Sequence, residues 1–232
     1  MAVVHRNLLC RRFVGLVPKT AKIVHRHIHT GTLRMTHIIL ASGSEIRRQL
    51  LENAGVSVRV IKAKIDEETI TQSLRAEGAK ARDVADALAE FKAEKVARLE
   101  PEALVIGSDQ VLDLQGELLA KPETPEHAIA QITAMSGKTH QLLSAAVIYG
   151  EGKPLWRHVG AVRMTVRSLS PSYIESYVAR NWDSIRHSVG GYKLEEEGVR
   201  LFSQVQGDYF TVLGLPLLEL LSYLTLRGEI DG

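Results

Sequence analysis

Several features that would assign this chain to a familiar class are scarce or missing. Cys10 is the single cysteine, which excludes an intramolecular disulfide or a cysteine cluster for zinc or iron and indicates a reducing compartment. No stretch reaches the roughly 20 consecutive apolar residues of a membrane helix, so we expect a soluble protein outside the membrane. Nor is there a Ser-His-Asp order, a zinc signature or a kinase motif set. The 232 residues, 45% of them hydrophobic, suffice for one large α/β domain or two small ones.

Acidic residues are missing from the first 34 positions. This stretch holds seven Lys or Arg residues, whereas the rest of the chain has 22 bases against 27 acids. We predict that residues 1–34 are a basic, disordered leader, either a targeting peptide or sequence upstream of a genuine start at Met35. Residues 35–232 then form the functional domain, cytoplasmic unless the leader directs it to an organelle. Because this domain carries no basic stripe, extended nucleic-acid binding is not expected.

Short apolar runs alternate with helical patterns after the leader, which indicates an α/β domain. Strands are predicted at 37–41, 56–61, 103–107, 140–149 and 156–166, with a small hairpin formed by 111–114 and 117–120. Helices are predicted from Ser44 to Gly55, over 82–99 and 125–134, from Ser170-Pro171 onwards, and over 214–226. The helix over 82–99 is expected to bury one face, formed by Val84, Leu88, Phe91 and Val96.

The turn after the first predicted strand has the features of a phosphate site. Ser42, Gly43 and Ser44 break the strand and lead into a helix start, where free backbone N–H groups and the positive end of the helix dipole attract anions. Arg47 and Arg48 add fixed positive charge. The same residues also fit an ordinary capped helix with two solvated arginines, and their spacing is not that of a P-loop.

Asp109 is the strongest candidate for catalytic chemistry. It directly follows a predicted buried strand, and the carboxyl ends of strands are where open α/β sheets bind ligands. A carboxylate there can hold a divalent cation and accept a proton from an attacking water, although it can also simply cap the next turn. Glu67 and Lys92 fit a solvated loop and helix surface equally well. Lys121, before Pro122 in a rigid turn, suits a phosphate contact.

A third segment, residues 190–198, contains three glycines and three consecutive glutamates. Its glycines would let the backbone approach a planar ligand, and its acids would accept hydrogen bonds from the N–H groups of a base. A plain charged loop explains the same composition.

Taken together and in this order, these segments resemble the Maf family from about His37 to Leu226. The family opens with I-L-A-S-x-S-P-R-R-x-x-L-L-x-x-x-G, which residues 39–55 mostly satisfy, with Glu45 at the position of the proline. The other matching segments are Asp66-Glu67, Lys92, Ser108-Asp109-Gln110, Gly116-Glu117, Lys121-Pro122, 136–140 and Gly214-Leu215-Pro216.

The resemblance implies an inosine triphosphatase-like fold, with a mixed central sheet flanked by helices and two lobes around a cleft, and usually a homodimer. It implies a house-cleaning hydrolase that splits the α,β bond of a nucleoside triphosphate into monophosphate and pyrophosphate, with Mg²⁺, Mn²⁺ or Co²⁺ as cofactor. By position, Asp109 matches the proton acceptor, and Asp109 and Glu67 the metal contacts. Glu67, Lys92 and Lys121 are implied as further catalytic residues, the two lysines by neutralising the triphosphate. The substrate contacts implied in the same way are Ser42, Ser44, Ile46, Arg47 and Arg48.

Two further positions bear on the substrate. Members acting on dTTP and UTP commonly have Thr after the catalytic Asp and Gln in the segment that matches 194–195, whereas those acting on 7-methyl-GTP tend to carry Gln and Glu. Gln110 and Glu195 therefore favour 7-methyl-GTP or another modified nucleotide, because Glu can accept from the N1–H and N2–H₂ groups of guanine. Members of that type often have Trp where this chain has Ile46, which cannot stack on a cationic base.

Other functions also fit the sequence. A dTTP/UTP pyrophosphatase would use the same catalytic residues with a different base pocket. A nucleotide-binding regulator of cell division would bind without turnover, and a structural or partner-binding domain would do neither. Retention of Asp109, Lys92 and Lys121 favours an enzyme.

Overall fold

The structure is a computed structural model that describes residues 37–231. The predictions for the basic leader lie outside the described residues. Among the described residues, no helix combines the length and the apolar character needed to span a bilayer.

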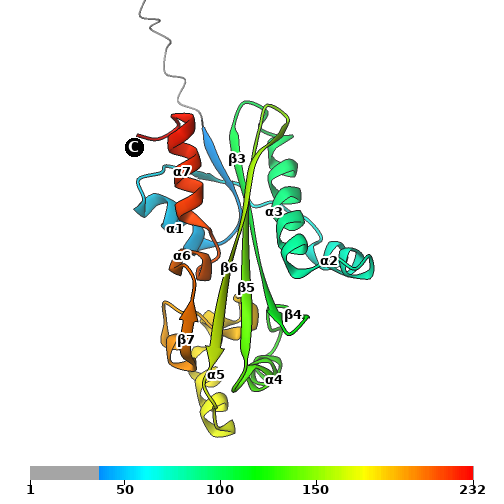
Figure 1. Cartoon of the computed structure of the whole chain (residues 1–232), viewed down its shortest axis with the longest axis vertical. Coiled ribbons are helices and arrows are strands. Elements are labelled where there is room, and N and C mark those ends of the chain that lie inside the picture. Colours follow the sequence, from blue (N-terminus) through cyan, green and yellow to red (C-terminus); the bar gives the residue numbers. More distant parts are fainter. Residues whose placement is uncertain (1–36, 232) are drawn as a thin grey trace, which may run out of the picture. The chain divides into compact units, whose positions relative to one another are not determined.

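A seven-stranded mixed sheet forms the centre of the described chain (Figure 1). Strand β1 is parallel to β2 and β3, and the other neighbouring strands are antiparallel. The order is β2-β1-β3-β5-β6-β7, with β4 also paired to β3. The strands are β1 (Ile38–Ala41), β2 (Arg59–Val60), β3 (Leu104–Leu114), β4 (Glu117–Leu119), β5 (Thr139–Gly150), β6 (Lys153–Val166) and β7 (Phe202–Gln206).

Helices cover both faces of this sheet, which confirms the predicted fold class. On one face α3 (Ala81–Ala97) packs on Val105 and Val111 of β3; on the other, α1 (Glu45–Asn53) and α7 (Leu217–Arg227) pack on Leu104 and Ile106. This alternation follows from the two-residue period of a strand. Figure 1 shows α3 on one side of β3 and β6, with α1 and α7 on the other. The predicted two lobes around a cleft stay a prediction.

The remaining helices extend these layers. The helices α4 (Pro125–Met135) and α5 (Pro171–Ile185) cover the far half of the α1/α7 face, against Leu112 of β3 and Leu142 of β5. The other helical elements are α2 (Glu67–Ala76), the 3₁₀ turns η1 (Val189–Gly191) and η2 (Glu197–Leu201), and α6 (Tyr209–Val212).

The position of Asp109 was predicted wrongly in one respect. Instead of a strand that ends before it and a separate hairpin strand after it, one strand, β3, runs through Asp109, because β5 pairs with it continuously from Val105 to Asp113. The parallel neighbour β1 stops at Ala41, opposite Gly107. Asp109 therefore lies at the carboxyl end of β1 but in the middle of β3.

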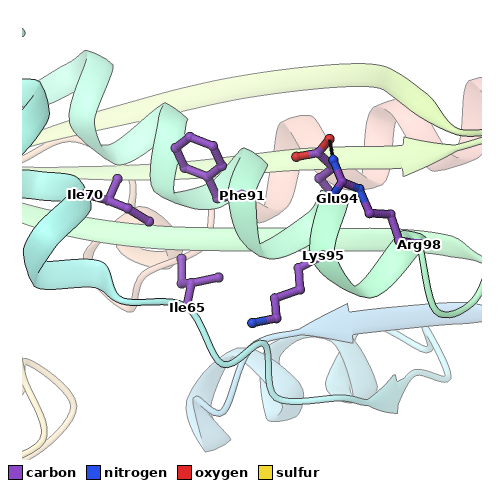
Figure 2. A pocket seen from close by; sticks show the side chains of 6 residues that line it. All are labelled: Ile65, Ile70, Phe91, Glu94, Lys95 and Arg98. Atoms are coloured by element: carbon purple, nitrogen blue, oxygen red, sulfur yellow. Dashed lines mark hydrogen bonds and ion pairs between the residues drawn. The ribbon is translucent and has the colours of Figure 1, made fainter.

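Two smaller predictions were also wrong. The strand predicted at 56–61 is reduced to Arg59–Val60, which is exposed at the sheet edge. Phe91 is 42% exposed rather than in the core. It faces α2 instead of the sheet and lines a surface hollow with Ile65 and Ile70, edged by an ion pair between Glu94 and Arg98 (Figure 2). Strand β7, helix α6 and the extent of α2 were not predicted from the sequence.

Candidate active site

Lys92 joins two carboxylates. Its Nζ lies 2.5 Å from Oδ1 of Asp109 and 2.8 Å from Oε1 of Glu67. Lys92 and Asp109 are buried, whereas Glu67 is about half exposed. The three side chains come from α3, β3 and the first residue of α2, so they are far apart in the sequence. The fold thus brings together the predicted proton acceptor, the predicted second metal contact and a predicted catalytic lysine.

The close packing of α3 on β3 explains why Lys92 reaches Asp109. A Cβ atom at Gly107 would lie 2.7 Å from the backbone nitrogen of Ala93 and closer still to the carbonyl oxygen of Ala89. Only glycine permits this approach without displacing the helix backbone. Asp109 follows two residues later on the same face of β3, beside the turn of α3 that carries Lys92.

The two carboxylates have opposite electrostatic environments. Burial raises the pKa of the Asp109 carboxyl above its ordinary value, although Lys92 and Arg47 act in the other direction. Burial also disfavours the charged form of Glu67, but Lys92, Lys121 and Arg47 together hold the pKa of its carboxyl below its ordinary value. Asp109 is therefore the better proton acceptor of the two, and Glu67 stays ionised near neutral pH.

Arg47 is buried next to this cluster and is held by three oxygens. Its Nε donates to the carbonyl oxygen of Gly214 at 2.8 Å, and its Nη1 donates to Ser42 Oγ at 3.1 Å and to the carbonyl oxygen of Ser108 at 2.8 Å. Gly214 has φ 98°, and a Cβ there would lie 3.1 Å from Arg47 Nε. The guanidinium therefore has a fixed place, and the turn at Gly214 depends on glycine.

One edge of β3 is unpaired beside this cluster. Strand β1 pairs with residues 104–107 and β4 with residues 112–114, so residues 108–111 have no strand neighbour on that side among residues 37–231. The N–H of Leu104 donates to His37 and the carbonyl of Ser108 accepts from Arg47, so the backbone groups of even-numbered residues point to this edge. The N–H and C=O of Gln110 face it as well, with no hydrogen bond to another described residue.

The Gln110 side chain lies on the opposite face of the sheet from Asp109. Its Nε2 donates to Ser144 Oγ at 2.9 Å and to the carbonyl oxygens of Val212 and Thr211 at 3.0 and 3.2 Å. The structure therefore does not bring this amide to the Asp109 carboxylate. The side chains of adjacent strand residues point to opposite faces of the sheet. The sequence could have predicted the separation of Gln110 from Asp109 only if a strand through both residues had been recognised.

The other residues of the α1 segment divide into two groups. Ser42 is buried, and its Oγ also accepts from the backbone N–H of Ser44 at 3.3 Å. Ser44 occupies the N-cap position of α1, but its side chain makes no capping hydrogen bond. Ile46 packs partly buried against the core under α7.

Arg48 faces solvent on α1 and pairs with Glu45 and with Glu52, the latter at 2.8 Å. The solvated reading of this arginine therefore fits its surroundings better than a place beside Arg47. Lys121 is exposed, and its charge contributes to the lowered pKa of Glu67.

The segment around Glu195 differs from its prediction. A Cβ atom at Gly190 would lie 2.5 Å from Cδ1 of Leu112, so this glycine makes room for the protein's own core, whereas a Cβ at Gly191 would be in ordinary contact with Ala128 and Pro122. Glu196 and Glu197 pair with cations of the protein itself. Glu195 is exposed and has no such partner among the described residues.

Lys62 is a residue that the sequence analysis did not single out. Its side chain crosses the turn between β1 and α1, because a Cβ atom at Gly43 would lie 3.1 Å from its Cδ and 3.3 Å from its Cε. The sequence offers no local signal for the contact between Lys62 and Gly43, apart from the extended chain expected after β2.

The residues present fit a divalent cation. Asp109 and Glu67 each give one oxygen to Lys92, which leaves the second oxygen of each carboxylate without a described partner. No group of three or more His, Cys, Asp or Glu side chains gathers in the described part of the chain. Magnesium in phosphate-processing sites needs only one or two carboxylates, since waters and substrate phosphates complete its shell.

Fold and site together define an α/β protein with a buried carboxylate–ammonium–carboxylate cluster beside a fixed arginine. Residues 37–226 match the model of the family described as Maf-like protein, and the chain belongs to this family. This confirms the family resemblance found in the sequence.

Three relatives illustrate the relationship. The chain is 63% identical over 194 residues to a protein of Ruegeria pomeroyi and 60% identical over 193 residues to one of Roseobacter denitrificans, both named nucleoside triphosphate pyrophosphatase. A protein of Mesorhizobium japonicum named 7-methyl-GTP pyrophosphatase is 48% identical over 195 residues. These alignments cover 83–84% of this chain and 97–98% of the relatives.

Proposed function

We propose that this protein is a nucleoside triphosphate pyrophosphatase, which hydrolyses the α,β-phosphoanhydride bond to give a nucleoside monophosphate and pyrophosphate. The observation that carries the proposal is the bridge from Lys92 to Asp109 and Glu67, with Arg47 fixed beside it. The names of the Ruegeria and Roseobacter relatives support this hydrolase activity.

In the proposed reaction, Asp109 acts as the proton acceptor. The water oxygen bonds to the α-phosphorus, the bond from that phosphorus to the bridging oxygen breaks, and the proton of the water passes to the carboxylate. Lys92 occupies Oδ1 of Asp109, so Oδ2 is the oxygen left, with one lone pair for the proton and another for a cation. Because burial raises the pKa of Asp109, this carboxylate holds a proton better than an exposed one.

Fixed cations stabilise the charge that develops on the phosphates. Arg47 and Lys92 are held by protein groups before substrate binds, so they need little reorganisation during the reaction. Lys121, being exposed, is free to turn towards the substrate.

We propose that Asp109 and Glu67 hold a divalent cation, Mg²⁺, Mn²⁺ or Co²⁺. Such a cation would polarise the phosphoryl oxygens and offset their negative charge. The lowered pKa of Glu67 keeps this ligand ionised across the neutral range.

The proposed substrate is 7-methyl-GTP or another modified nucleotide. Glu195 is exposed with no described partner, so its carboxylate is available to the N–H groups of a guanine edge. The unpaired N–H and C=O of Gln110 offer one hydrogen-bond donor and one acceptor. They lie on the edge of β3 in the gap between β1 and β4. The name of the Mesorhizobium relative supports the same substrate. A preference for dTTP or UTP is the alternative within the same reaction.

The homodimer, the cytoplasmic location and the absence of a nucleic-acid partner belong to this proposal as well. They rest on the family resemblance and on the charge of residues 35–232. Light scattering of the purified chain would show a mass of twice 25.6 kDa for a dimer.

A pyrophosphate-release assay tests the proposal directly. The full chain would be incubated with 7-methyl-GTP, GTP, dTTP, UTP or CTP and each of the three metals, with Asp109→Asn as the control. We expect metal-dependent release, fastest with 7-methyl-GTP and lost in the variant. Release from none of the nucleotides would overturn the proposal, and nucleotide binding without release would favour a regulator.

A further inference from the structure

We propose that Lys62 is a further substrate-binding residue, whose ammonium holds the β- and γ-phosphates that leave as pyrophosphate. This inference rests on the proposed function and assigns a role to a residue outside the motifs that match the family. Its basis is the contact across the turn at Gly43, the charge balance of the site and the open first turn of α1.

The main chain fixes where Lys62 lies. The N–H of Ile61 donates to the carbonyl oxygen of Leu40 at 3.1 Å, which holds the chain after β2 against the end of β1. The next residue, Lys62, then lies beside the turn that follows β1. Its Cγ, Cδ and Cε all come within 3.1–3.4 Å of the place of a Cβ at Gly43. The aliphatic stem is therefore supported by the turn while the ammonium stays at the surface.

The charge balance of the cluster calls for another cation. Asp109 and Glu67 carry two negative charges that offset the charges of Lys92 and Arg47, both of which are already bonded to protein oxygens. Beyond this balanced cluster, Lys121 and the proposed divalent cation offer positive charge, and a further cation would help to balance the several negative charges of a triphosphate. Lys62 is exposed and has no hydrogen bond or ion pair to another described residue, so its charge is available.

The first turn of α1 provides suitable neighbours. Ser44 caps the helix by position only and leaves the first N–H groups of α1 without a side-chain acceptor. A phosphate placed between these N–H groups and the Lys62 ammonium would satisfy both. Arg48 is less available for this part than Lys62, since it is already paired with Glu45 and Glu52.

Substitution of Lys62 separates phosphate binding from the chemical step. Lys62→Met keeps most of the stem and removes the charge. Lys62→Arg keeps the charge, and Lys153→Met removes another exposed lysine, at the start of β6. We expect Lys62→Met to raise the KM for the triphosphate and the inhibition constant of pyrophosphate about fivefold each, at low salt, with kcat within about twofold. Inhibition by the nucleoside monophosphate should be unchanged, because that product lacks the β- and γ-phosphates.

The controls decide between outcomes. Lys62→Arg should restore both constants, and Lys153→Met should leave them unchanged. Unchanged pyrophosphate inhibition in Lys62→Met would overturn the inference, as would an equal effect in Lys153→Met or an equal loss of monophosphate inhibition.

A second measurement keeps this test separate from the proposed function. The rise in melting temperature caused by pyrophosphate is measured without turnover, and Lys62→Met should reduce it while leaving the melting temperature of the free protein unchanged. If the full chain released no pyrophosphate from any nucleotide, the proposed reaction would fail. The Lys62 inference would then stand or fall on this thermal shift alone.

Discussion

The surroundings of Asp109 and of Glu195 differ in how strongly the fold determines them. Around Asp109, the charged groups are buried or bonded and come from a strand and three helices, and the turn at Gly214 holds Arg47 in place. Glu195 lies exposed between two 3₁₀ turns, without a described partner. The comparison suggests that the fold fixes the chemistry rigidly and leaves the choice of base to a surface segment that can change without disturbing the core.

The largest effect should come from Asp109→Asn. Loss of the proton acceptor should lower kcat about a thousandfold, as is usual for general bases. Burial raises the pKa of Asp109, so its ionised form opposes folding increasingly as pH rises above the ordinary Asp range. The variant should keep most of its stability at pH 7, because loss of the buried charge offsets the weaker bond that an amide oxygen accepts from Lys92. A parallel loss of activity and stability, seen by calorimetry, would show that Asp109 is structural.

Arg47→Met tests how much of the rigidity around Asp109 depends on one side chain. Three oxygens would lose their donor, which should lower the free energy of unfolding by about 4 kcal/mol, measured by urea denaturation. Arg48→Met is the matched control one residue later, and loss of its exposed ion pairs should change the free energy of unfolding much less. Similar losses in the two variants would contradict the proposed difference between them.

The contact between Tyr192 and His140, at the start of the segment that contains Glu195, should make the stability of the protein depend on pH. Tyr192, three residues before Glu195, has its hydroxyl 2.6 Å from Nε2 of His140, and burial lowers the pKa of His140 to about 4. Because this pKa is below the unfolded value of 6.5, the stabilisation is complete above pH 6.5 and is lost as pH falls towards 4. Stability should drop by about 2 kcal/mol between pH 7 and 5. In His140→Gln most of this slope should disappear from urea titrations.

Glu195→Gln should change selectivity and little else. Loss of the carboxylate should reduce the preference for 7-methyl-GTP over UTP about tenfold, judged by the ratio of kcat/KM values. Because Glu195 is exposed, the melting temperature should not move. Glu197→Gln is a control in the same segment, since its carboxylate already pairs with Arg180. An unchanged preference in Glu195→Gln would remove this residue from the base site.

Much of the fold could be predicted because its elements have strong local signals. The Gln115-Gly116 turn has φ 57° and 96°, as expected of a tight hairpin, and Ser170 caps α5 by accepting from the N–H of Tyr173. Strand β7 could not be found in this way, because four of its five residues are exposed and only its pairing with β6 defines it.

The candidate site was predicted in its residues better than in its arrangement. Lys92 and Glu67 were named individually, but only the packing of α3 at Gly107 brings Lys92 to Asp109. The side chains of Gln110 and Asp109 point to opposite faces of the sheet because one strand passes through both residues. The sequence pattern predicted that this strand ends at residue 107, so this difference was not foreseen. Lys62 was missed because its contact with Gly43 is a tertiary one.

Because the pairing of β3 is interrupted, hydrogen exchange at this strand can show whether a nucleotide is bound at its unpaired edge. The amide hydrogen of Gln110 points to the unpaired edge, whereas those of Asp109 and Val111 point towards β5. Deuterium should therefore enter at Gln110 well before its two neighbours, which open only with the sheet. A nucleotide that bonds to this edge would slow the exchange at that one amide, so occupancy could be followed without any substitution.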